Sequence, residues 1–255
     1  MIHEATTPAA VLKWAEFSGD FNPIHFDLAR AAKAGSDRLI VHGMLALLHV
    51  KQATMRALAA VTSADDGWSR FKALFRNPIP QSSRLDLSIR PKNEGVRFVL
   101  QGDSREYGRG VHETLQTPPL QQANASPAYV LEAAYVQAQH ARFCESFRFV
   151  HDDWIFLDAL IFGKFLQQRF GRLSEIPPDI VAVQVSHSVS CVPRQLKARF
   201  SDVDRIPHVG YSVRNEDKSA SPGSESGVAE LDVFVDGSPA MVIEIGLLAK
   251  AGVPA

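Results

Sequence analysis

Hydrophobic and polar positions follow the same order twice along this chain of 255 residues. In each half, a stretch that is apolar on nearly all sides precedes segments in which hydrophobic and polar residues alternate. A helix that is apolar all round is buried by its surroundings, whereas strict alternation is typical of a strand with one face in water. The pattern therefore predicts an α+β chain in which a buried helix and a run of antiparallel strands occur twice.

The first half opens with a short predicted helix over residues 7–17. Thr7 is a suitable N-cap, and Pro8 stands at the first helical position, where its missing N–H is tolerated. The apolar stretch over residues 42–60 contains no helix breaker and predicts the first buried helix. Alternating segments separated by glycine-containing turns predict strands over residues 84–90, 95–106 and 108–116.

The second half repeats this order, beginning with a predicted buried helix over residues 154–170. The alternation over residues 179–192 predicts a strand that places on one face Val181, Val183, Val185, His187, Val189 and Cys191. A meander of further strands is expected over residues 195–203, 208–217, 228–237 and 239–250. The sequence Val-Asp-Gly-Ser-Pro between the last two is typical of a hairpin turn.

Two polar segments interrupt the hydrophobic pattern. Residues 116–128 are rich in Pro, Gln, Asn and Ser, which is typical of a linker. We therefore predict a first domain over residues 1–117, a linker over 118–128 and a second domain over 129–255. The second polar segment, Asn215–Gly227, is expected to form an exposed loop between two strands.

The two predicted units can join edge to edge, which would bury a free edge strand of each sheet. The repeat is structural, because the two halves share little residue identity.

Composition and charge exclude several classes of protein. Hydrophobic residues make up 45% of the chain and charged residues 22%, and the net charge of −1 gives no general attraction to nucleic acid or to an anionic membrane. No apolar run reaches the roughly 18 residues of a membrane span, and the first residues lack the regions of a signal peptide. Two cysteines, Cys144 and Cys191, form neither a disulfide framework nor a metal-ligand pattern. We expect a cytoplasmic protein.

The segment Phe17–Phe26, with the sequence FSGDFNPIHF, has the backbone of a shaped loop. Pro23 fixes its own φ and pushes Asn22 toward extended geometry. Gly19 permits a tight backbone at the start of the loop. A helix is therefore not expected between these residues.

Such a loop allows the side chains of Asp20 and His25 to converge on one point, whereas a helix would place residues five apart on different faces. Ser18 and Asn22 are candidates for the hydrogen bonds that hold the loop in shape. An acid and an imidazole that share one point are the groups needed for proton transfer.

Gly43 stands immediately before the first buried helix. The free backbone N–H groups at the positive end of a helix can bind a developing oxyanion, and a residue without a side chain lets a carbonyl oxygen come close. Together with Asp20 and His25, this helix end would supply the parts for proton transfer next to a carbonyl group.

The stretch Phe17–Leu47 resembles the signature of MaoC-like (R)-specific enoyl-thioester hydratases and dehydratases. It contains S-G-D-x-N-P-I-H, a following acid (Asp27), an alanine-rich stretch and a closing I-x-H-G-M that ends at Met44. The resemblance implies the hot-dog fold, and two tandem units imply a double hot dog, with two antiparallel sheets each wrapped round a long central helix. Beyond this stretch the resemblance depends on the order of elements alone.

The resemblance also implies a mechanism. Asp20 and His25 would hold one water molecule and activate it for attack at C3 of a 2-enoyl thioester, with a proton delivered to C2 on the same face, or the reverse in dehydration. The backbone N–H of Gly43 would polarise the thioester carbonyl. No metal or redox cofactor is implied, and the acyl group would arrive on the phosphopantetheine of coenzyme A or of an acyl carrier protein.

Other reactive side chains have simpler interpretations. His42 is expected to support the loop rather than to react. His49 falls on the first buried helix and is expected in the core, as are His187 and Cys191 on their strand. No base is placed beside Cys144 by the sequence, which argues against a nucleophile there.

Asp158 lies within the otherwise apolar second helix, and a buried carboxylate is costly unless it is paired. The register WIFLDAL is weakly similar to the helix of 3-hydroxydecanoyl-thioester and polyketide-synthase dehydratases, in which this position is a catalytic acid. The Pro-Gly that precedes the helix in those families is replaced here by Asp152-Asp153, which are good N-cap residues. The position of the partner histidine is not clearly occupied, although His140 and His151 are the nearest candidates. Asp158 is therefore either a second catalytic acid or a structural residue. In the structural role, its carboxylate would bond a strand side chain or face solvent.

The leading hypothesis is an (R)-specific hydratase or dehydratase of acyl thioesters whose second half shapes the acyl pocket. Phe156, Phe162 and other aromatic residues of the second helix could line that pocket or fill the core. A hot-dog thioesterase and a non-catalytic acyl-binding protein are the alternatives. An acyl carrier protein and a second copy of the chain, in a homodimer, are possible partners. Binding to nucleic acid is not expected.

Overall fold

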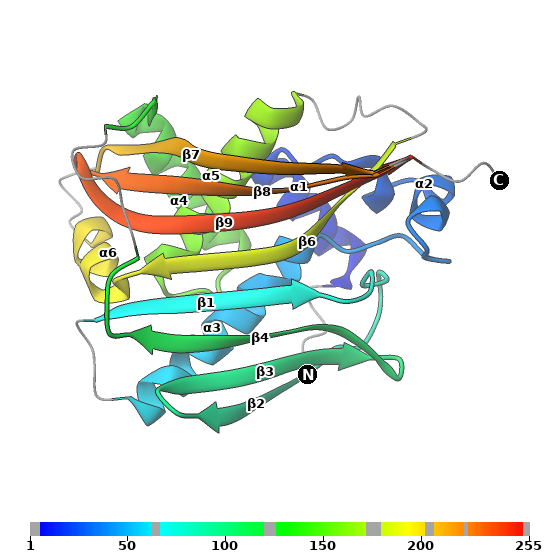
Figure 1. The fold of residues 1–255 in the computed structure, drawn as a ribbon, viewed down its shortest axis with the longest axis horizontal. Helices are drawn as coiled ribbons and strands as arrows, with labels where there is room; N and C mark the ends of the chain where they lie inside the picture. Colours follow the sequence, from blue (N-terminus) through cyan, green and yellow to red (C-terminus); the bar gives the residue numbers. More distant parts are fainter. Residues whose placement is uncertain are drawn as a thin grey trace.

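The computed structural model describes residues 6–62, 67–119, 126–171, 180–201, 207–221 and 224–251. Within them the chain is α+β, as predicted, with helices gathered on one face of a large antiparallel sheet (Figure 1). The predicted linker lies largely outside the described residues, and the domain boundaries stay predictions. No helix of the described part is long and apolar enough to span a membrane.

The first half begins with α1 (Pro8–Ser18), for which Thr7 is the N-cap as predicted: its side chain accepts a hydrogen bond from the Ala10 N–H. Gly19 ends this helix in the left-handed conformation, with φ of 74°. The buried helix α3 (Gly43–Val61) is also confirmed. The remaining elements of this half are η2 (Pro23–His25), α2 (Leu28–Lys33), β1 (Trp68–Phe75), β2 (Asp86–Lys92), β3 (Gly95–Gly102) and β4 (Arg105–Leu115).

The second half has the predicted buried helix as α5 (Asp153–Phe170). Asp152 is its N-cap residue, but its carboxylate accepts a hydrogen bond from Gln52 instead of capping the helix. The predicted hairpin turn is present, with Asp236 and Gly237 both at positive φ. The other elements are β5 (Tyr129–Leu131), α4 (Ala133–Ser146), β6 (Ile180–Cys191), α6 (Pro193–Phe200), β7 (Val209–Ser221), β8 (Ser224–Val235) and β9 (Ser238–Ala251).

The described strands form one continuous sheet in the order β2-β3-β4-β1-β6-β9-β8-β7-β5. The two predicted sheets are thus joined edge to edge, and the joint is the antiparallel pair β1 and β6, from Ser69↔Cys191 to Leu74↔Ser186. Helix α3 lies behind the first half of the sheet and α5 behind the second (Figure 1). Edge-to-edge joining satisfies backbone groups that each half would otherwise leave unpaired.

Two predicted elements are wrong. Where a strand was expected over residues 195–203, the chain forms helix α6: Pro193 occupies its first turn, and Leu196 and Phe200 pack on the core at helical spacing, while residues 202–203 lie outside the described part. The loop expected over Asn215–Gly227 instead continues strands β7 and β8, which pair as far as Ser221↔Ser224, although residues 222–223 lie outside the described part. Backbone hydrogen bonds hold this part of the hairpin together although neither of its faces is hydrophobic. The sequence therefore contains no alternation of hydrophobic and polar residues that would predict these strands.

The register of β6 contains a bulge that sequence alternation did not predict. Gln184 pairs with Leu247 and Ser186 with Gly246, so that Val185 is an extra residue on this strand. A bulge changes which side chains share a face. Val181 packs against Ile24 of the first half, whereas His187 contacts α5, so the predicted single face from Val181 to Cys191 is interrupted.

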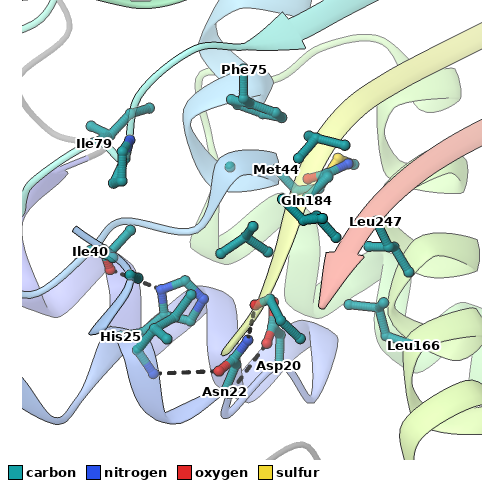
Figure 2. Close-up of a pocket in the computed structure, with 18 of the residues that line it drawn as sticks. Asp20, Asn22, His25, Ile40, Met44, Phe75, Ile79, Leu166, Gln184 and Leu247 are labelled. Carbon is teal, nitrogen blue, oxygen red and sulfur yellow. Dashed lines mark hydrogen bonds between the residues drawn. The ribbon is translucent and has the colours of Figure 1, made fainter. Parts of the chain in front are cut away.

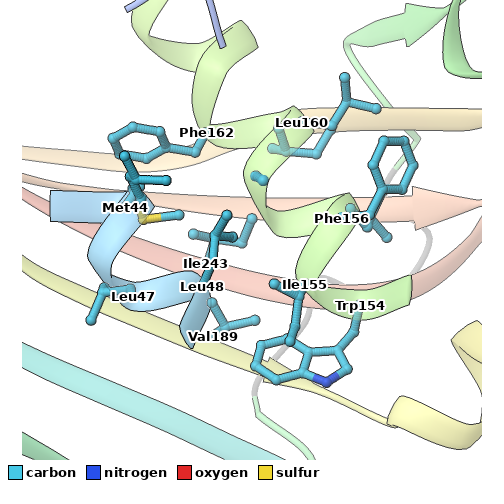
Figure 3. Packing of buried hydrophobic residues seen from close by; sticks show 14 of the residues in the cluster. Met44, Leu47, Leu48, Trp154, Ile155, Phe156, Leu160, Phe162, Val189 and Ile243 are labelled. Carbon is cyan, nitrogen blue, oxygen red and sulfur yellow. The ribbon is translucent and has the colours of Figure 1, made fainter. Parts of the chain in front are cut away.

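The two buried helices share one hydrophobic core. Met44, Leu47 and Leu48 of α3 face α5, and Val189 of β6 closes the space between them (Figure 3). On the side of α5, the residues that complete this part of the core are Trp154, Ile155, Phe156, Leu160 and Phe162. Because each helix covers the other, neither half has a complete core of its own.

A charged network crosses this core. The Asp158 carboxylate of α5 accepts hydrogen bonds from Lys51 Nζ of α3 and from His187 Nε2 of β6, the latter at 2.9 Å. All three side chains are fully buried. Burial alone would raise the pKa of Asp158, but the adjacent His187 and Lys51 outweigh it and hold that pKa below its ordinary value.

Replacing Lys51 with methionine is expected to lower the free energy of unfolding by about 3–5 kcal/mol, because the buried Asp158 carboxylate loses a charged partner. The double variant Lys51→Met/Asp158→Leu is expected to recover part of this loss, since it removes both charges. Urea unfolding followed by circular dichroism measures both effects. Equal stability of Lys51→Met and the wild type would show that the pair is not ionised in the folded protein.

Candidate active site

The loop between α1 and η2 is shaped by its own short polar side chains. Ser18 Oγ donates to the Trp14 carbonyl and accepts from the Asp20 N–H at 3.1 Å. The Asp20 carboxylate accepts from the Asn22 N–H at 3.3 Å, and Asn22 Oδ1 caps η2 by accepting from the Ile24 N–H. These are the local hydrogen bonds that Ser, Asp and Asn make where the chain leaves a helix.

The second half of the chain holds this loop from the other side. Asn22 Nδ2 donates to the Ala182 carbonyl of β6 at 2.9 Å. Gln167 of α5 donates to the Ser18 carbonyl at 2.9 Å, and Gly163 lets the loop backbone approach α5 closely: a Cβ there would lie 2.6 Å from the same carbonyl oxygen. Both halves therefore determine where Asp20 points.

Asp20, His25 and His42 converge at the end of the loop. One nitrogen of each histidine and one carboxylate oxygen of Asp20 lie within 4.8 Å of one another, and all three residues are buried. The two imidazole rings lie with their centroids 3.6 Å apart. The structure thus places Asp20 and His25 together, as the sequence predicted, and adds His42 to the cluster.

Hydrogen bonds to backbone carbonyls determine the tautomers of both histidines. His25 Nδ1 lies 2.9 Å from the Ile40 carbonyl oxygen, and His42 Nε2 lies 2.8 Å from that of Asp20. A carbonyl only accepts, so each of these nitrogens carries a proton. In the neutral ring, His25 Nε2 therefore has a free lone pair, whereas His42 uses its proton to hold the Asp20 backbone.

Burial shifts the pKa values of all three groups toward their uncharged forms. It raises the pKa of Asp20, against the opposing effects of His25 and of the Asn22 N–H. It lowers the pKa of His25, which the Asp20 carboxylate and the Ile40 carbonyl partly restore. It lowers the pKa of His42 well below the ordinary range, with His25 adding to the effect. A neutral imidazole next to a carboxyl group of raised pKa is a pair suited to exchanging protons.

Gly43 is the first residue of α3, where backbone N–H groups have no partner within the helix. A Cβ at this position would lie 2.7 Å from the Phe75 ring and 3.1 Å from Gln184 Oε1. Glycine therefore lets the Phe75 ring and the Gln184 amide lie close to the start of α3, and the free N–H groups of this helix end can bind a carbonyl oxygen.

These groups border a cavity of about 290 Å³ (Figure 2). Asp20, Asn22, His25 and Gly43 lie on its wall, and the rest of the lining is mainly apolar. The second half contributes Phe162, which the sequence offered as a pocket or core residue, whereas Phe156 lies in the core. It also contributes residues that sequence reasoning did not identify, from α5, β6 and β9: Leu166, Phe170, Ala182, Gln184 and Leu247. Such a concave, largely apolar site with a few polar groups is typical of a pocket for a small ligand.

Other candidates lie away from this cavity. Asp158 is not part of its lining, and its bonds to Lys51 and to the strand residue His187 correspond to the structural alternative. His49 stacks on Phe149, and burial lowers its pKa to about 4.

Cys144 has the wrong environment for a nucleophile. His140 Nε2 lies 3.7 Å from its sulfur, but the same nitrogen is 3.0 Å from the Asp153 carboxylate. Burial and Asp153 raise the pKa of the thiol, which disfavours the thiolate.

Comparison with known proteins gives a family match for the part of the chain that carries these residues. Residues 2–103, which include the whole Asp20–Gly43 region, match the family model of the MaoC like domain. Among curated proteins, none matches the sequence.

Among the solved structures that are similar to this chain, two cover more than nine tenths of it. One, described as a MaoC-like dehydratase, has a TM-score of 0.52 and 11% sequence identity and covers 94% of each chain. The other, a conserved protein of unknown function with a hot dog fold from Alicyclobacillus acidocaldarius, has a TM-score of 0.50 and 12% identity and covers 92% of each chain. At such identities the similarity concerns the fold, and the predicted hot-dog fold is confirmed.

Imidazole titration by NMR is expected to give pKa values below 6.5 for both His25 and His42. In Asp20→Asn the pKa of His25 should fall further, because the carboxylate that raises it has been removed. Asp37→Asn, at an exposed carboxylate, is the matched control and should leave the titration of His25 unchanged. A higher pKa of His25 in Asp20→Asn would contradict the proximity of the two side chains.

Proposed function

We propose that this chain, whose residues 2–103 match the family model of the MaoC like domain, is an (R)-specific hydratase or dehydratase of 2-enoyl or 3-hydroxyacyl thioesters. The observation that carries this proposal is the convergence of Asp20 and His25 beside the N-terminus of α3 in a mainly apolar cavity. The acyl carrier would be coenzyme A or an acyl carrier protein.

In the dehydration direction, His25 Nε2 has the free lone pair that can take the proton from C2. The raised pKa of Asp20 suits its carboxyl group to donate a proton to the 3-hydroxyl group as the C3–O bond breaks. Water and a C2–C3 double bond result, and a proton passes from His25 back to Asp20 to restore the starting state. Hydration is the reverse, with one water molecule held between the two side chains.

Removal of the C2 proton places negative charge on the thioester oxygen. The N–H groups at the start of α3, which borders the cavity at Gly43, would stabilise that charge. His42 contributes by holding the Asp20 backbone, and Ser18 and Asn22 by holding the loop. The apolar wall from α5 and β9 would receive the acyl chain.

No resident cofactor enters this proposal, since the chemistry needs only proton transfer and an oxyanion site. A thioesterase would instead direct water to the thioester carbonyl, and an acyl-binding protein would show affinity without turnover. The loop that brings Asp20 and His25 together favours the hydratase or dehydratase, because both side chains can reach a single water or hydroxyl group.

Asp20→Asn and His25→Gln are each expected to lower kcat/KM for crotonyl- to decenoyl-thioesters by at least about a hundredfold, the scale of a lost general acid or base. Loss of the conjugated enoyl absorbance follows the reaction. Asp37→Asn and His151→Gln, at exposed positions, are the matched controls. The acid limb of the pH profile should lie below pH 6.5, because burial lowers the pKa of His25 and its neutral form persists there.

Two results would contradict the proposal. One is wild-type turnover that survives both substitutions within a few fold. The other is release of free thiol from a saturated acyl thioester without hydration of the enoyl substrate, which is the signature of the thioesterase.

Treatment with a chelator such as EDTA is expected to leave the hydration rate unchanged, because the proposed steps use Asp20 and His25 as proton carriers. The experiment is informative because Asp20, His25 and His42 have the ligand types and proximity of a cation site. Loss of activity on chelation, with recovery on adding a divalent cation, would assign the cluster to a metal and overturn the cofactor-free mechanism.

A further inference from the structure

The bulge in β6 gives the second half of the chain a polar group in the cavity. Residues 184 and 187 are three apart and would lie on opposite faces of a regular strand. Because Val185 is an extra residue, Gln184 and His187 approach each other, and Gln184 Nε2 lies 3.2 Å from His187 Nδ1. Gln184 also lines the cavity that Asp20 and His25 border (Figure 2).

The buried charged network determines which end of the Gln184 amide faces the cavity. The Asp158 carboxylate accepts from His187 Nε2, so that nitrogen carries the ring proton. His187 Nδ1 is then an acceptor, and burial, which lowers the pKa of His187, keeps the ring neutral. Only the NH₂ group of Gln184 can donate to it, and the carbonyl Oε1 must therefore point away from His187.

The contact of Gln184 with Gly43 shows where Oε1 lies. Gln184 Oε1 lies 3.1 Å from the place of a Cβ on Gly43, at the N-terminus of α3. Among the described residues, no hydrogen-bond donor is found for this oxygen. The cavity thus presents an acceptor with a determined orientation directly beside the proposed oxyanion site.

A ligand group that binds this acceptor must be a hydrogen-bond donor. Near the reacting carbonyl, a 3-hydroxyacyl thioester on phosphopantetheine has two donors: the 3-hydroxyl group and the first amide N–H of the carrier arm. The 3-hydroxyl group belongs at Asp20 and His25, which exchange its proton. The thioester oxygen is itself an acceptor and is directed to the N–H groups of α3.

We propose that Gln184 Oε1 accepts a hydrogen bond from the first amide N–H of the phosphopantetheine arm, and that Gln184 thereby selects amide-bearing thioesters. This inference rests on the proposed function for the placement of the thioester. Gln184 is a binding and positioning residue, and the network of Lys51, Asp158 and His187 acts through it by fixing its amide.

The test compares two thioesters that differ in one group. Hexanoyl-N-acetylcysteamine retains the arm's first amide, and the hexanoyl thioester of 2-mercaptoethyl acetate has an ester oxygen in place of its N–H. The wild type is expected to bind the amide compound about 3- to 10-fold more tightly, the usual value of one hydrogen bond. Because neither saturated compound is hydrated, calorimetry or NMR titration gives both dissociation constants without turnover.

In Gln184→Met, a substitution of similar size, the preference is expected to fall to within about twofold, with affinity for the ester compound unchanged. Gln168→Met is the matched control, because that glutamine bonds Tyr211 outside the cavity, and it should keep the wild-type preference. The ratio of the two constants is independent of the amount of folded protein, so partial misfolding of a variant does not affect the result.

Equal binding of the two compounds by the wild type, or equal weakening of both in Gln184→Met, would overturn the inference. The second result would indicate contact with the acyl part or a merely structural role. Preference for the amide compound without hydration of any enoyl thioester would instead refute the proposed function and leave the role of Gln184 standing. The two failures are therefore distinguishable.

Discussion

The pairing of β1 with β6 is the constraint on which the rest of the structure depends. It joins two half-sheets into one, and it ends at Leu74↔Ser186, immediately before the bulge at Val185. Beyond that point β6 runs on without β1, and its free edge offers the Ala182 carbonyl to Asn22. The end of this pairing leaves β6 free to anchor the loop, and the adjacent bulge directs Gln184 toward the cavity.

The site is asymmetric although the fold is a repeat. The first half supplies Asp20, His25 and the N-terminus of α3, and the second half supplies a mainly apolar wall and the anchors of the loop. The second half carries its buried acid, Asp158, within α5, where its charge is satisfied in the core by Lys51 and His187. A buried carboxylate with two such partners is stabilised in its ionised form, and it does not face the cavity.

Local chemistry made much of the fold predictable. Thr7 and Pro8 start α1 as expected, and the apolar stretches that became α3 and α5 are buried on nearly all sides in their first turns. Strand β1 was not predicted, although Ser69, Phe71 and Ala73 alternate with Arg70 and Lys72 and carried the signal. Helix α6 was mistaken for a strand because its apolar stripe is only two residues long, Leu196 and Phe200, in an eight-residue helix.

The sequence by itself determined the match of residues 2–103 to the MaoC like domain, the loop that brings Asp20 to His25 and the glycine at the start of α3, because each depends on residues that are neighbours along the chain. The tertiary structure alone decided the partners of Asp158, the apolar wall and the orientation of Gln184. These depend on contacts between residues more than a hundred positions apart, as between Lys51 and Asp158, and on a bulge that shifts the register of one strand. Periodicity describes which face a residue occupies in a regular element, and it contains no information about what packs against that face.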